Sequence, residues 1–577
     1  MSNINISVNQ IKVITGDIVG NTNKILNCIK TDIINDTLIS VFPETAISGY
    51  MCGSLWDRID FVKDQFNKIF DIQNTMIENN HLGIAIVGVV RFCGVHRNGF
   101  PILKNSVAVI STDHIEFYDK QILASTDHHE DKKYFSAGTE TKIFNLNVPS
   151  KNVNIFIGIP ICEDSWYLDH SRNIPQEMVQ MGAELLIIPN QSYFYYNKQK
   201  KRYNLFSSIA KDNNVDVITV NALGVGDILK NIVIFDGGSM SFNKNGEMIC
   251  ALPQFVETST TFNLNDTTPI EFYEKEKYRE IIEAIVFEQK EYFGLMGIKK
   301  GQVHISGGLD SAIVAYLVQK AMGKDNTVLI TNPSSLNTKS LKFVKELSDN
   351  LGISYFTNPI EDIYQKIIEV HTNSFNETLS DTGKASVQAV LRTVQGLAAS
   401  HQFKSGIVAT GNHTEIVLGW ASFHDIGSIG VHAIIGDLTK VELFQLAKYI
   451  NESEGREIIP NEIFDGRFKP AAELPDANED PIDYWVQSGI CASLIRDRKT
   501  KKQLVDDYND KSLNIDYFPK MEEVYKYDLN GWENEVNFAV NKMRTSVYKA
   551  AQGAPIVIMS PRSRGFSNRE TLINFYK

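Results

Sequence analysis

The residues with the clearest chemistry stand at positions 306–311 and read SGGLDS. The apolar residues 302–305 before them and 312–318 after them predict a turn between a buried strand and a helix. Glycines let the backbone approach an anion closely, the amides of a helix N-terminus point at phosphate, and serine hydroxyls add donors. A plain turn would explain the two glycines, but not the serines and the aspartate at these offsets. We therefore predict an ATP-binding loop formed by Ser306, Gly307, Gly308, Asp310 and Ser311.

Two further segments of the second half place polar side chains after predicted strands. Residues 409–415, ATGNHTE, follow an apolar run, and Lys440 follows a tight turn. Because ligands bind at the carboxyl ends of parallel strands, we expect Thr410 to reach the nucleotide and Glu415 to join Asp310 around magnesium. Lys440 suits a phosphate oxygen of ATP, and its alternative interpretation is a surface lysine at the start of a helix. Together these groups predict metal-assisted cleavage of a nucleotide.

The first half contains a cysteine whose sequence context is that of a catalytic nucleophile. Cys162 directly follows the segment 158–161, so its thiol is expected at the end of a strand. Glu44, in FPETAISGY, can take the thiol proton, and Lys120, in FYDKQ, can stabilise the thiolate and the oxyanion of a tetrahedral intermediate. Taken singly, each residue has an ordinary explanation as a core cysteine, a surface acid or a solvated lysine.

Two α/β regions must position these groups. In the first, short apolar runs that predict strands alternate with helical stretches, and residues 235–246 predict a late hairpin. A polar, breaker-rich stretch at 258–270 precedes a charged amphipathic pattern, which predicts a helix over residues 273–293. In the second region, predicted strands alternate with predicted helices, which is typical of a parallel sheet with crossover helices. We therefore expect two domains, residues 1–265 and residues 266–577.

The composition is that of an ordinary globular protein, since 43% of the 577 residues are hydrophobic and 22% are charged. This length suits two large domains. The net charge of −12 argues against a nucleic-acid partner. The 6 cysteines form no CxxC pair or metal spacing, which argues against disulfides or zinc and favours a reducing cytoplasm. No apolar run approaches the roughly 18 residues of a membrane span, so we expect no membrane partner.

These segments resemble those of two known families. The loop at 306–311 is similar to the SGGxDS signature of the N-type ATP pyrophosphatases, which split ATP between its α and β phosphates. Glu44, Lys120 and Cys162, in their sequence contexts, resemble the catalytic residues of the nitrilase superfamily over residues 1–260. The resemblances imply an N-terminal nitrilase-like α-β-β-α sandwich, followed by a C-terminal Rossmann-like parallel-sheet ATP pyrophosphatase domain.

The nitrilase resemblance implies further site residues. In glutamine-using members, the residue at Ser192 and a basic residue near Lys198 contact the substrate. The supporting second acid of the superfamily falls at Glu130 or Asp131, which the sequence register does not separate. Glutaminase relatives usually carry an aromatic residue where this chain has Thr126.

The second half is also similar to NAD synthetases, through the segments TGNHTE, GW, IIGDLTK and PAAEL within residues 275–500. This resemblance implies that Asp425 is the active-site aspartate of the family, although the usual Tyr-Gly-Asp is replaced here. It also implies that Gln388 and Arg392 bind the acceptor together with Glu415. The family pattern Asn-x-Gln-x-Arg-x-Arg survives only at Gln388 and Arg392.

A nitrilase-like glutaminase joined to this second half is the arrangement of glutamine-dependent NAD synthetases. It implies that glutamine is hydrolysed at Cys162 and that ammonia passes through an internal channel to adenylated deamido-NAD, with ATP and Mg²⁺ required. It also implies a cytoplasmic homo-oligomer. Three alternatives remain: the same chemistry on another carboxylate such as nicotinate mononucleotide, a nucleotide-binding sensor or scaffold without turnover, and an amidase fused to an inert partner.

Overall fold

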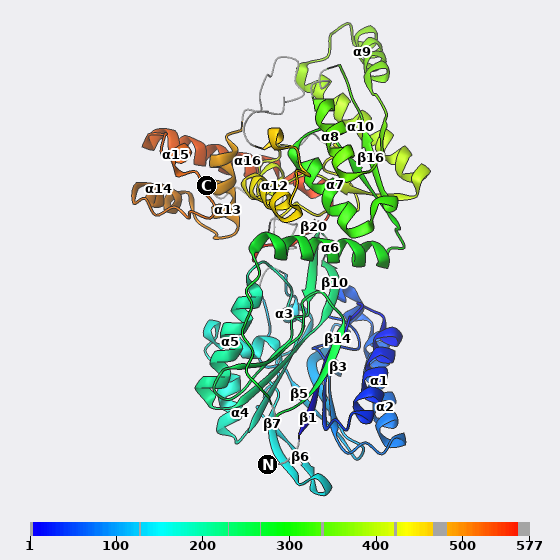
Figure 1. Ribbon diagram of the computed structural model, residues 1–577, viewed down its shortest axis with the longest axis vertical. Helices are drawn as coiled ribbons and strands as arrows, with labels where there is room; N and C mark the ends of the chain where they lie inside the picture. The colour runs from blue at the N-terminus through cyan, green and yellow to red at the C-terminus, as the bar shows by residue number, and fades with distance from the viewer. Residues whose placement is uncertain are drawn as a thin grey trace. The chain divides into compact units, whose positions relative to one another are not determined.

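The computed structural model describes residues 4–125, 128–228, 230–265, 267–335, 340–420, 424–464 and 482–563 (Figure 1). The chain divides into two compact units. The first consists of Met1–Ile228 with Val233–Lys277, and the second of Leu229–Ile232 with Tyr278–Lys577.

The first unit is a four-layer α-β-β-α sandwich, which confirms the predicted fold. Helices α1 and α2 cover one sheet and α4 and α5 cover the other (Figure 1). The described part of one sheet has the order β14 (Thr258–Asn263), β1 (Asn5–Gln10), β2 (Ile39–Val41), β3 (Ile84–Val95), β4 (Pro101–Ile110) and β5 (Ile115–Asp119). The other has the order β13 (Met248–Ala251), β12 (Met240–Phe242), β9 (Asp216–Asn221), β8 (Leu185–Asn190), β7 (Val153–Gly158) and β6 (Ile143–Val148). The helices are α1 (Ile18–Ile34), α2 (Ile59–Glu78), α3 (Asp131–Tyr134), α4 (Ile174–Gln180) and α5 (Lys198–Asn213).

Both sheets combine parallel strands at the centre with antiparallel strands at the edges. β1, β2 and β3 are parallel to one another, as are β7, β8 and β9. Alternate side chains of both sheets, such as Val41, Ile86, Ile157 and Ile187, are fully buried in one hydrophobic core. The carboxyl ends of β2, β7 and β8 therefore present the segments that follow them, which include the candidate groups of the first unit.

The second unit is built on a parallel sheet, as predicted for a Rossmann-like domain. Its order is β20 (Ile556–Val557), β19 (His432–Ala433), β18 (Ser405–Ala409), β15 (Lys300–His304), β16 (Thr327–Thr331) and β17 (Tyr355–Thr357). Asn231 and Ile232, at the start of β11 (Asn231–Asp236), pair in parallel with β20. The helices up to the last crossover are α6 (Lys277–Leu295), α7 (Leu309–Met322), α8 (Leu341–Leu351), α9 (Glu361–Phe375), α10 (Asp381–Phe403), α11 (His413–Leu418) and α12 (Lys440–Glu454).

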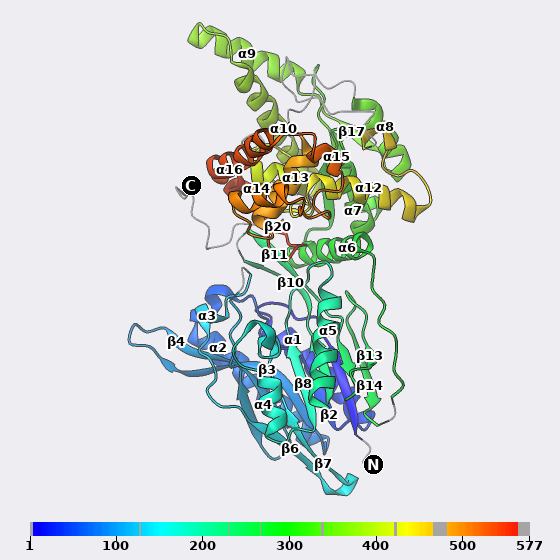
Figure 2. The same ribbon diagram turned by 90° about the vertical axis from the view of Figure 1, so that its left-hand side faces the viewer.

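Four C-terminal helices of this unit gather into a separate cluster (Figures 1 and 2). Phe518 and Trp532 are fully buried at its centre, and the ring of Tyr508 stacks on Trp532 with a centroid distance of 4.7 Å. These aromatic rings lie in a hydrophobic core that the cluster shares with Val417 and Leu418 of α11. The helices are α13 (Tyr484–Ile495), α14 (Lys501–Asn509), α15 (Met521–Val524) and α16 (Leu529–Gln552).

The sequence located most elements closely. The strand, loop and helix predicted around residues 302–318 are β15, the turn and α7. The helix predicted over 273–293 begins later, at Lys277, and the late hairpin lies further along the chain, between β12 and β13. Among the described residues, no helix is both long and apolar enough to cross a bilayer.

Candidate active sites

The nucleophile candidate Cys162 sits in a tight turn after β7. Its φ of +43° lies in the left-handed region, as does the φ of +45° at Thr45, next to Glu44. Non-glycine residues adopt this conformation only where the surroundings enforce it, which is common at functional sites. Burial, and then the negative charge of Glu44, raise the pKa of the Cys162 thiol well above its ordinary value. The resting group is therefore a thiol, which needs a base to become a nucleophile.

A buried ion-pair network supplies that base. The Lys120 ammonium lies 2.7 Å from Glu44 Oε1 and 2.8 Å from Asp131 Oδ2, and all three side chains are buried. Burial by itself lowers the pKa of Lys120, but the charges of Asp131 and Glu44 outweigh it and hold that pKa well above its usual range. The structure also separates the two candidates for the second acid, because Glu130 contacts Lys133 instead.

Three residues that the sequence did not single out hold this network in place. Asn105 Nδ2 donates to Glu44 Oε1 at 2.7 Å, and the amide of Gln191 donates to Glu44 Oε2 at 3.0 Å. The Tyr50 hydroxyl donates to Asp131 Oδ1. Tyr50 lies in the FPETAISGY segment, but the sequence assigned no role to any of the three residues, so the folded arrangement identifies them.

The two residues predicted to bind glutamine follow β8. Ser192 is fixed through its backbone, since its amide donates to Asn221 Oδ1 at 2.9 Å and its carbonyl accepts from Arg202 Nη2 at 2.9 Å. Lys198 Nζ donates to the backbone carbonyl of Tyr193 at 2.8 Å and lies 4.2 Å from the centroid of the Tyr193 ring. Burial, and then the charge of Arg202, lower the pKa of Lys198 to about 7.

The Lys198 ammonium opposes the rise in the pKa of Cys162, so the predicted glutamine-binding lysine lies within electrostatic reach of the nucleophile candidate. The Glu163 carboxylate also acts on both groups, and its Oε1 contacts His170 Nε2 at 2.9 Å. Thr126, where relatives carry an aromatic residue, lies outside the described residues.

The second unit contains a cavity of about 1070 Å³ at the carboxyl ends of β15 and β18. Its volume suits a nucleotide with room for a second substrate. The predicted residues that line it are Ser306, Gly308, Asp310, Ser311, Thr410, Glu415, Asp425 and Lys440.

The predicted phosphate loop, residues 306–311, contains a glycine in the left-handed region. Gly307 adopts a φ of +83°, and a Cβ at this position would lie 2.4 Å from the Ser340 carbonyl oxygen. Only glycine fits there without displacing the backbone. The Gly308 amide donates to Ser306 Oγ at 3.2 Å, and Ser311 Oγ donates to the Gly308 carbonyl at 3.1 Å. These bonds fix the loop at the N-terminus of α7, where helix amides favour an anion.

The predicted metal ligands lie around one ammonium group. Lys440 Nζ is 2.6 Å from Asp310 Oδ1 and 3.6 Å from Glu415 Oε1, and Asn412 Nδ2 donates to Asp310 Oδ2 at 2.8 Å. Two carboxylates that already share a cation fit a hard divalent ion such as Mg²⁺. No cluster of three or more acidic, histidine or cysteine ligands occurs within the described ranges, so substrate phosphates would have to complete the coordination.

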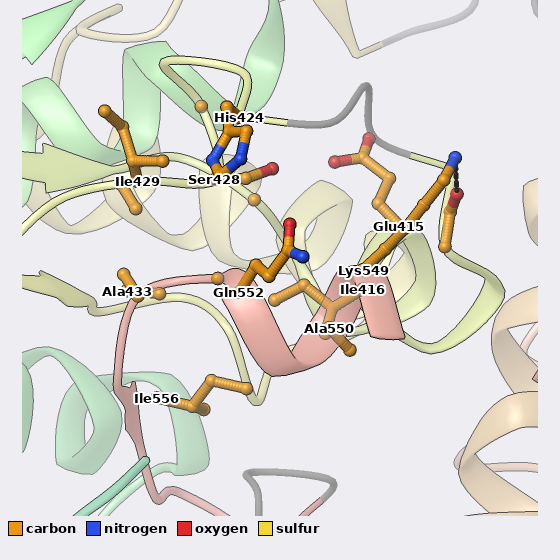
Figure 3. Close-up of a pocket in the computed structure, with 16 residues that line it drawn as sticks. Glu415, Ile416, His424, Ser428, Ile429, Ala433, Lys549, Ala550, Gln552 and Ile556 are labelled. Carbon is orange, nitrogen blue, oxygen red and sulfur yellow. Dashed lines mark hydrogen bonds between the residues drawn. The ribbon is translucent and has the colours of Figure 1, made fainter. Parts of the chain in front are cut away.

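A smaller cavity of about 40 Å³ shares Gly411, Glu415 and Gly427 with the larger one. In Figure 3, residues of α11 and α16 converge on it, and Lys549 Nζ donates to the Gly419 carbonyl at 3.0 Å. Its size admits a water-sized molecule next to Glu415.

The two predicted acceptor-binding residues on α10 do not line these cavities. Arg392 Nε donates to the Asn332 carbonyl, after β16, at 3.3 Å. Gln388 is fully buried, and its side-chain amide has no hydrogen-bond partner among the described residues. The structure thus gathers the ATP-side predictions around one cavity, whose lining does not include the acceptor pair.

Family comparisons agree with this division into two sites. Residues 5–270 match the carbon-nitrogen hydrolase family, and residues 281–527 match the NAD synthase family. The glutamine-dependent NAD(+) synthetase of Thermotoga maritima is 26% identical over 521 residues, which cover 83% of this chain and 86% of that protein. The enzyme of the same name from Aquifex aeolicus is 27% identical over 545 residues, which cover 87% of this chain and 91% of that protein.

Solved structures show the same fold over the whole chain. The glutamine-dependent NAD+ synthetase of Acinetobacter baumannii, solved in complex with ADP, superposes with a TM-score of 0.73 at 21% identity and 99% coverage of both chains. The glutamine-dependent NAD(+) synthetase of Cytophaga hutchinsonii superposes with a TM-score of 0.80 at 17% identity, covering 100% of this chain and 98% of that one. With both family models matched in order and relatives aligned over most of its length, this chain belongs to the glutamine-dependent NAD(+) synthetases.

Proposed function

We propose that this chain hydrolyses glutamine and uses the nitrogen, with ATP, to amidate deamido-NAD to NAD, releasing AMP, pyrophosphate and glutamate. The observation that carries the proposal is the presence of two complete sets of groups in one chain. The first is the buried Glu44–Lys120–Asp131 network beside Cys162, and the second is the phosphate-loop cavity with Asp310 and Lys440. We assign the glutaminase to residues 1–265 and the synthetase to residues 266–577.

The glutaminase reaction uses the thiol and its neighbours in turn. Glu44 takes the proton of Cys162 as the sulfur attacks the side-chain carbonyl of glutamine, and Lys120 stabilises the resulting oxyanion. The carbon-nitrogen bond breaks, the nitrogen receives the proton from Glu44, and ammonia leaves a glutamyl thioester. Water activated by Glu44 then cleaves the thioester to glutamate. Ser192 and Lys198 hold the amino-acid end of glutamine, and the Lys198 ammonium suits its carboxylate.

In the synthetase reaction, the phosphate loop and Lys440 hold the phosphates of ATP, and Thr410 contacts the nucleotide. A carboxylate oxygen of deamido-NAD attacks the α-phosphorus, the bond to the β-phosphate breaks, and pyrophosphate leaves. Ammonia then attacks the acyl adenylate and displaces AMP, with Asp425 placed to accept a proton from the nitrogen. A Mg²⁺ ion held by Asp310 and Glu415 would neutralise the phosphate charge.

The acceptor is assigned as deamido-NAD, with Gln388 and Arg392 among its ligands. The named relatives support this acceptor and give no support to nicotinate mononucleotide. Incubating the enzyme with each carboxylate, ATP and ammonia, followed by mass spectrometry of the amide product, distinguishes the two. A larger yield of the mononucleotide amide would contradict the assignment.

The division of labour is tested by Cys162→Ala, with the exposed Cys93→Ala as the matched control. We expect Cys162→Ala to abolish NAD formation from glutamine and to leave formation from ammonia unchanged, because the second site keeps all its groups. Cys93→Ala should retain both activities. If ammonia fails to rescue Cys162→Ala while that protein remains folded, the proposal is wrong.

The proposal also covers the cellular location and the oligomeric state of the enzyme. Cys28, Cys52, Cys93, Cys162 and Cys250 are free, which suits a reducing cytoplasm. We propose a cytoplasmic homo-oligomer that acts on small molecules only, and sedimentation of the purified chain at micromolar concentration tests the oligomeric state.

A further inference from the structure

Asp164 is a buried carboxylate, two residues after Cys162, that the proposed reaction does not use. Its oxygens accept four hydrogen bonds. Oδ1 accepts from the amides of Gln121 at 3.1 Å and Ile122 at 2.7 Å, and Oδ2 accepts from the Ile161 amide and the Tyr118 hydroxyl, both at 3.0 Å. A buried carboxylate needs such a set of donors, and here the donors come from two separate parts of the chain.

The backbone donors to Asp164 are next in sequence to two candidate catalytic residues. Ile161 immediately precedes Cys162, whereas Gln121 and Ile122 immediately follow Lys120. One carboxylate therefore ties the turn that carries the sulfur to the turn that carries the ammonium. The Cys162 turn is also the one with a left-handed backbone, which has to be held by its surroundings.

We propose that Asp164 is a positioning residue for glutamine hydrolysis, which fixes the Cys162 sulfur relative to the Lys120 ammonium without touching the substrate. The inference rests on the proposed glutaminase function. It adds to the reacting groups a residue, Asp164, that sets the distance between Cys162 and Lys120. Such a residue matters because small displacements of reacting groups reduce rates strongly.

The electrostatic surroundings of Asp164 make this role pH-dependent. Burial raises its pKa to about 6, while amide donors, the charge of Lys120 and the Tyr118 hydroxyl oppose the rise. The charge of Arg172 also reaches Asp164, and Arg172 Nη1 donates to Gln121 Oε1 at 2.8 Å. Below pH 6 the carboxyl takes up a proton and loses acceptor capacity, so the two turns are held less firmly.

The test is Asp164→Asn, because an amide keeps the shape but offers one acceptor oxygen in place of two. We expect kcat for glutamine hydrolysis to fall by about 10- to 100-fold, with the KM for glutamine and ammonia-dependent synthesis unchanged. The acid limb of the wild-type pH profile near pH 6 should be absent from the variant. Asp169→Asn, an exposed aspartate on the same segment, serves as the control and should behave as wild type.

A second variant keeps the proposal falsifiable if Asp164→Asn folds poorly. Tyr118→Phe removes a single donor to Asp164 and should lower kcat for glutamine by about threefold, with ammonia-dependent synthesis retained. Wild-type kcat in Asp164→Asn, or an equal loss of both activities in a folded protein, would overturn the positioning role. Failure of the proposed function itself would appear differently, as glutamine use that survives Cys162→Ala.

Discussion

The two sites of this chain handle charge in opposite ways. In the first unit, the side chains of Lys120 and Glu44 are each only 1% exposed and pair with one another inside the protein. In the second unit, the side chains of Lys440, Asp310 and Glu415 are 10%, 13% and 22% exposed and face a large cavity. The first network is complete without substrate, whereas the second has room for several more charged groups.

This difference matches the chemistry proposed for each site. Glutamine hydrolysis changes charge at one thiol and one carbonyl oxygen, so a fixed, dry arrangement of a base and an ammonium is sufficient. The proposed ATP cleavage would bring several phosphate charges and a metal ion into the site. Lys440 would then contact phosphate oxygens, and Asp310 and Glu415 would hold the cation. We call the Cys162 site of the first unit the closed site and the cavity of the second unit the open site. We therefore expect activity at the closed site to be sensitive to the loss of single atoms, and the contacts in the open site to depend on which ligands are bound.

The sharpest test of the closed site is Glu44→Gln, which keeps the shape and removes the base. We expect glutamine-dependent NAD formation to fall by about 1000-fold, because the Cys162 thiol is protonated at rest and loses its proton acceptor. Ammonia-dependent synthesis should be unchanged. Steady-state assays with both nitrogen donors measure this, and the exposed Glu140→Gln is the control. Glutamine activity within tenfold of wild type would contradict the role of Glu44.

In the open site the matching change is Asp310→Asn. We expect AMP and pyrophosphate release to fall by about 100-fold with either nitrogen donor, since one predicted metal ligand and the partner of Lys440 are lost together. Titration with Mg²⁺ should show a higher half-saturating concentration than in wild type. The exposed Asp325→Asn is the control. A loss of activity with glutamine but not with ammonia would contradict the proposed role of Asp310 in ATP cleavage.

The sequence could indicate candidate reacting groups but not the residues that support them, and the two sites show why. Cys162, Glu44 and Lys120 stand in recognisable local contexts, and the loop at 306–311 encodes its own turn and helix start. Asn105, Tyr50 and Asp131 act through contacts with residues 61, 81 and 11 positions away, and such pairings arise only when the sheets pack. For the same reason the register left Glu130 and Asp131 undecided, while a single distance to Lys120 decides between them.

Lys440 shows a different limit of the sequence. Its context predicted a phosphate ligand, which stays a prediction, but it did not indicate the contacts of the Lys440 ammonium with Asp310 and Glu415. A sequence pattern does not say which partner a cation takes before the substrate arrives. The burial of Gln388 and Arg392, the predicted acceptor ligands, likewise depends on the packing of α10, which the sequence pattern does not specify.

A moderate effect is expected when the phosphate loop is stiffened by Gly307→Ala. The new Cβ would lie 2.4 Å from the Ser340 carbonyl and would require a positive φ, a strain of about 1–3 kcal/mol. We expect the KM for ATP to rise by about tenfold with both nitrogen donors, since the strain displaces the amides that face phosphate. Gly294→Ala, in α6 with open space around it, is the control. An unchanged KM for ATP would show that the loop tolerates the displacement.

The smallest expected effect comes from pH at Lys198 in the closed site. Burial lowers the pKa of its ammonium to about 7, so the group is charged below pH 7 and becomes neutral as the pH rises. Because the charged form attracts the glutamine carboxylate, the KM for glutamine should rise by about fivefold between pH 7 and pH 8. Lys198→Arg should remove this rise, since a guanidinium stays charged throughout that range. The measurement is the KM for glutamine at half-unit pH intervals in both proteins. A rise of equal size in the arginine variant would assign the titration to another group and would leave Lys198 a structural lysine held by the Tyr193 carbonyl.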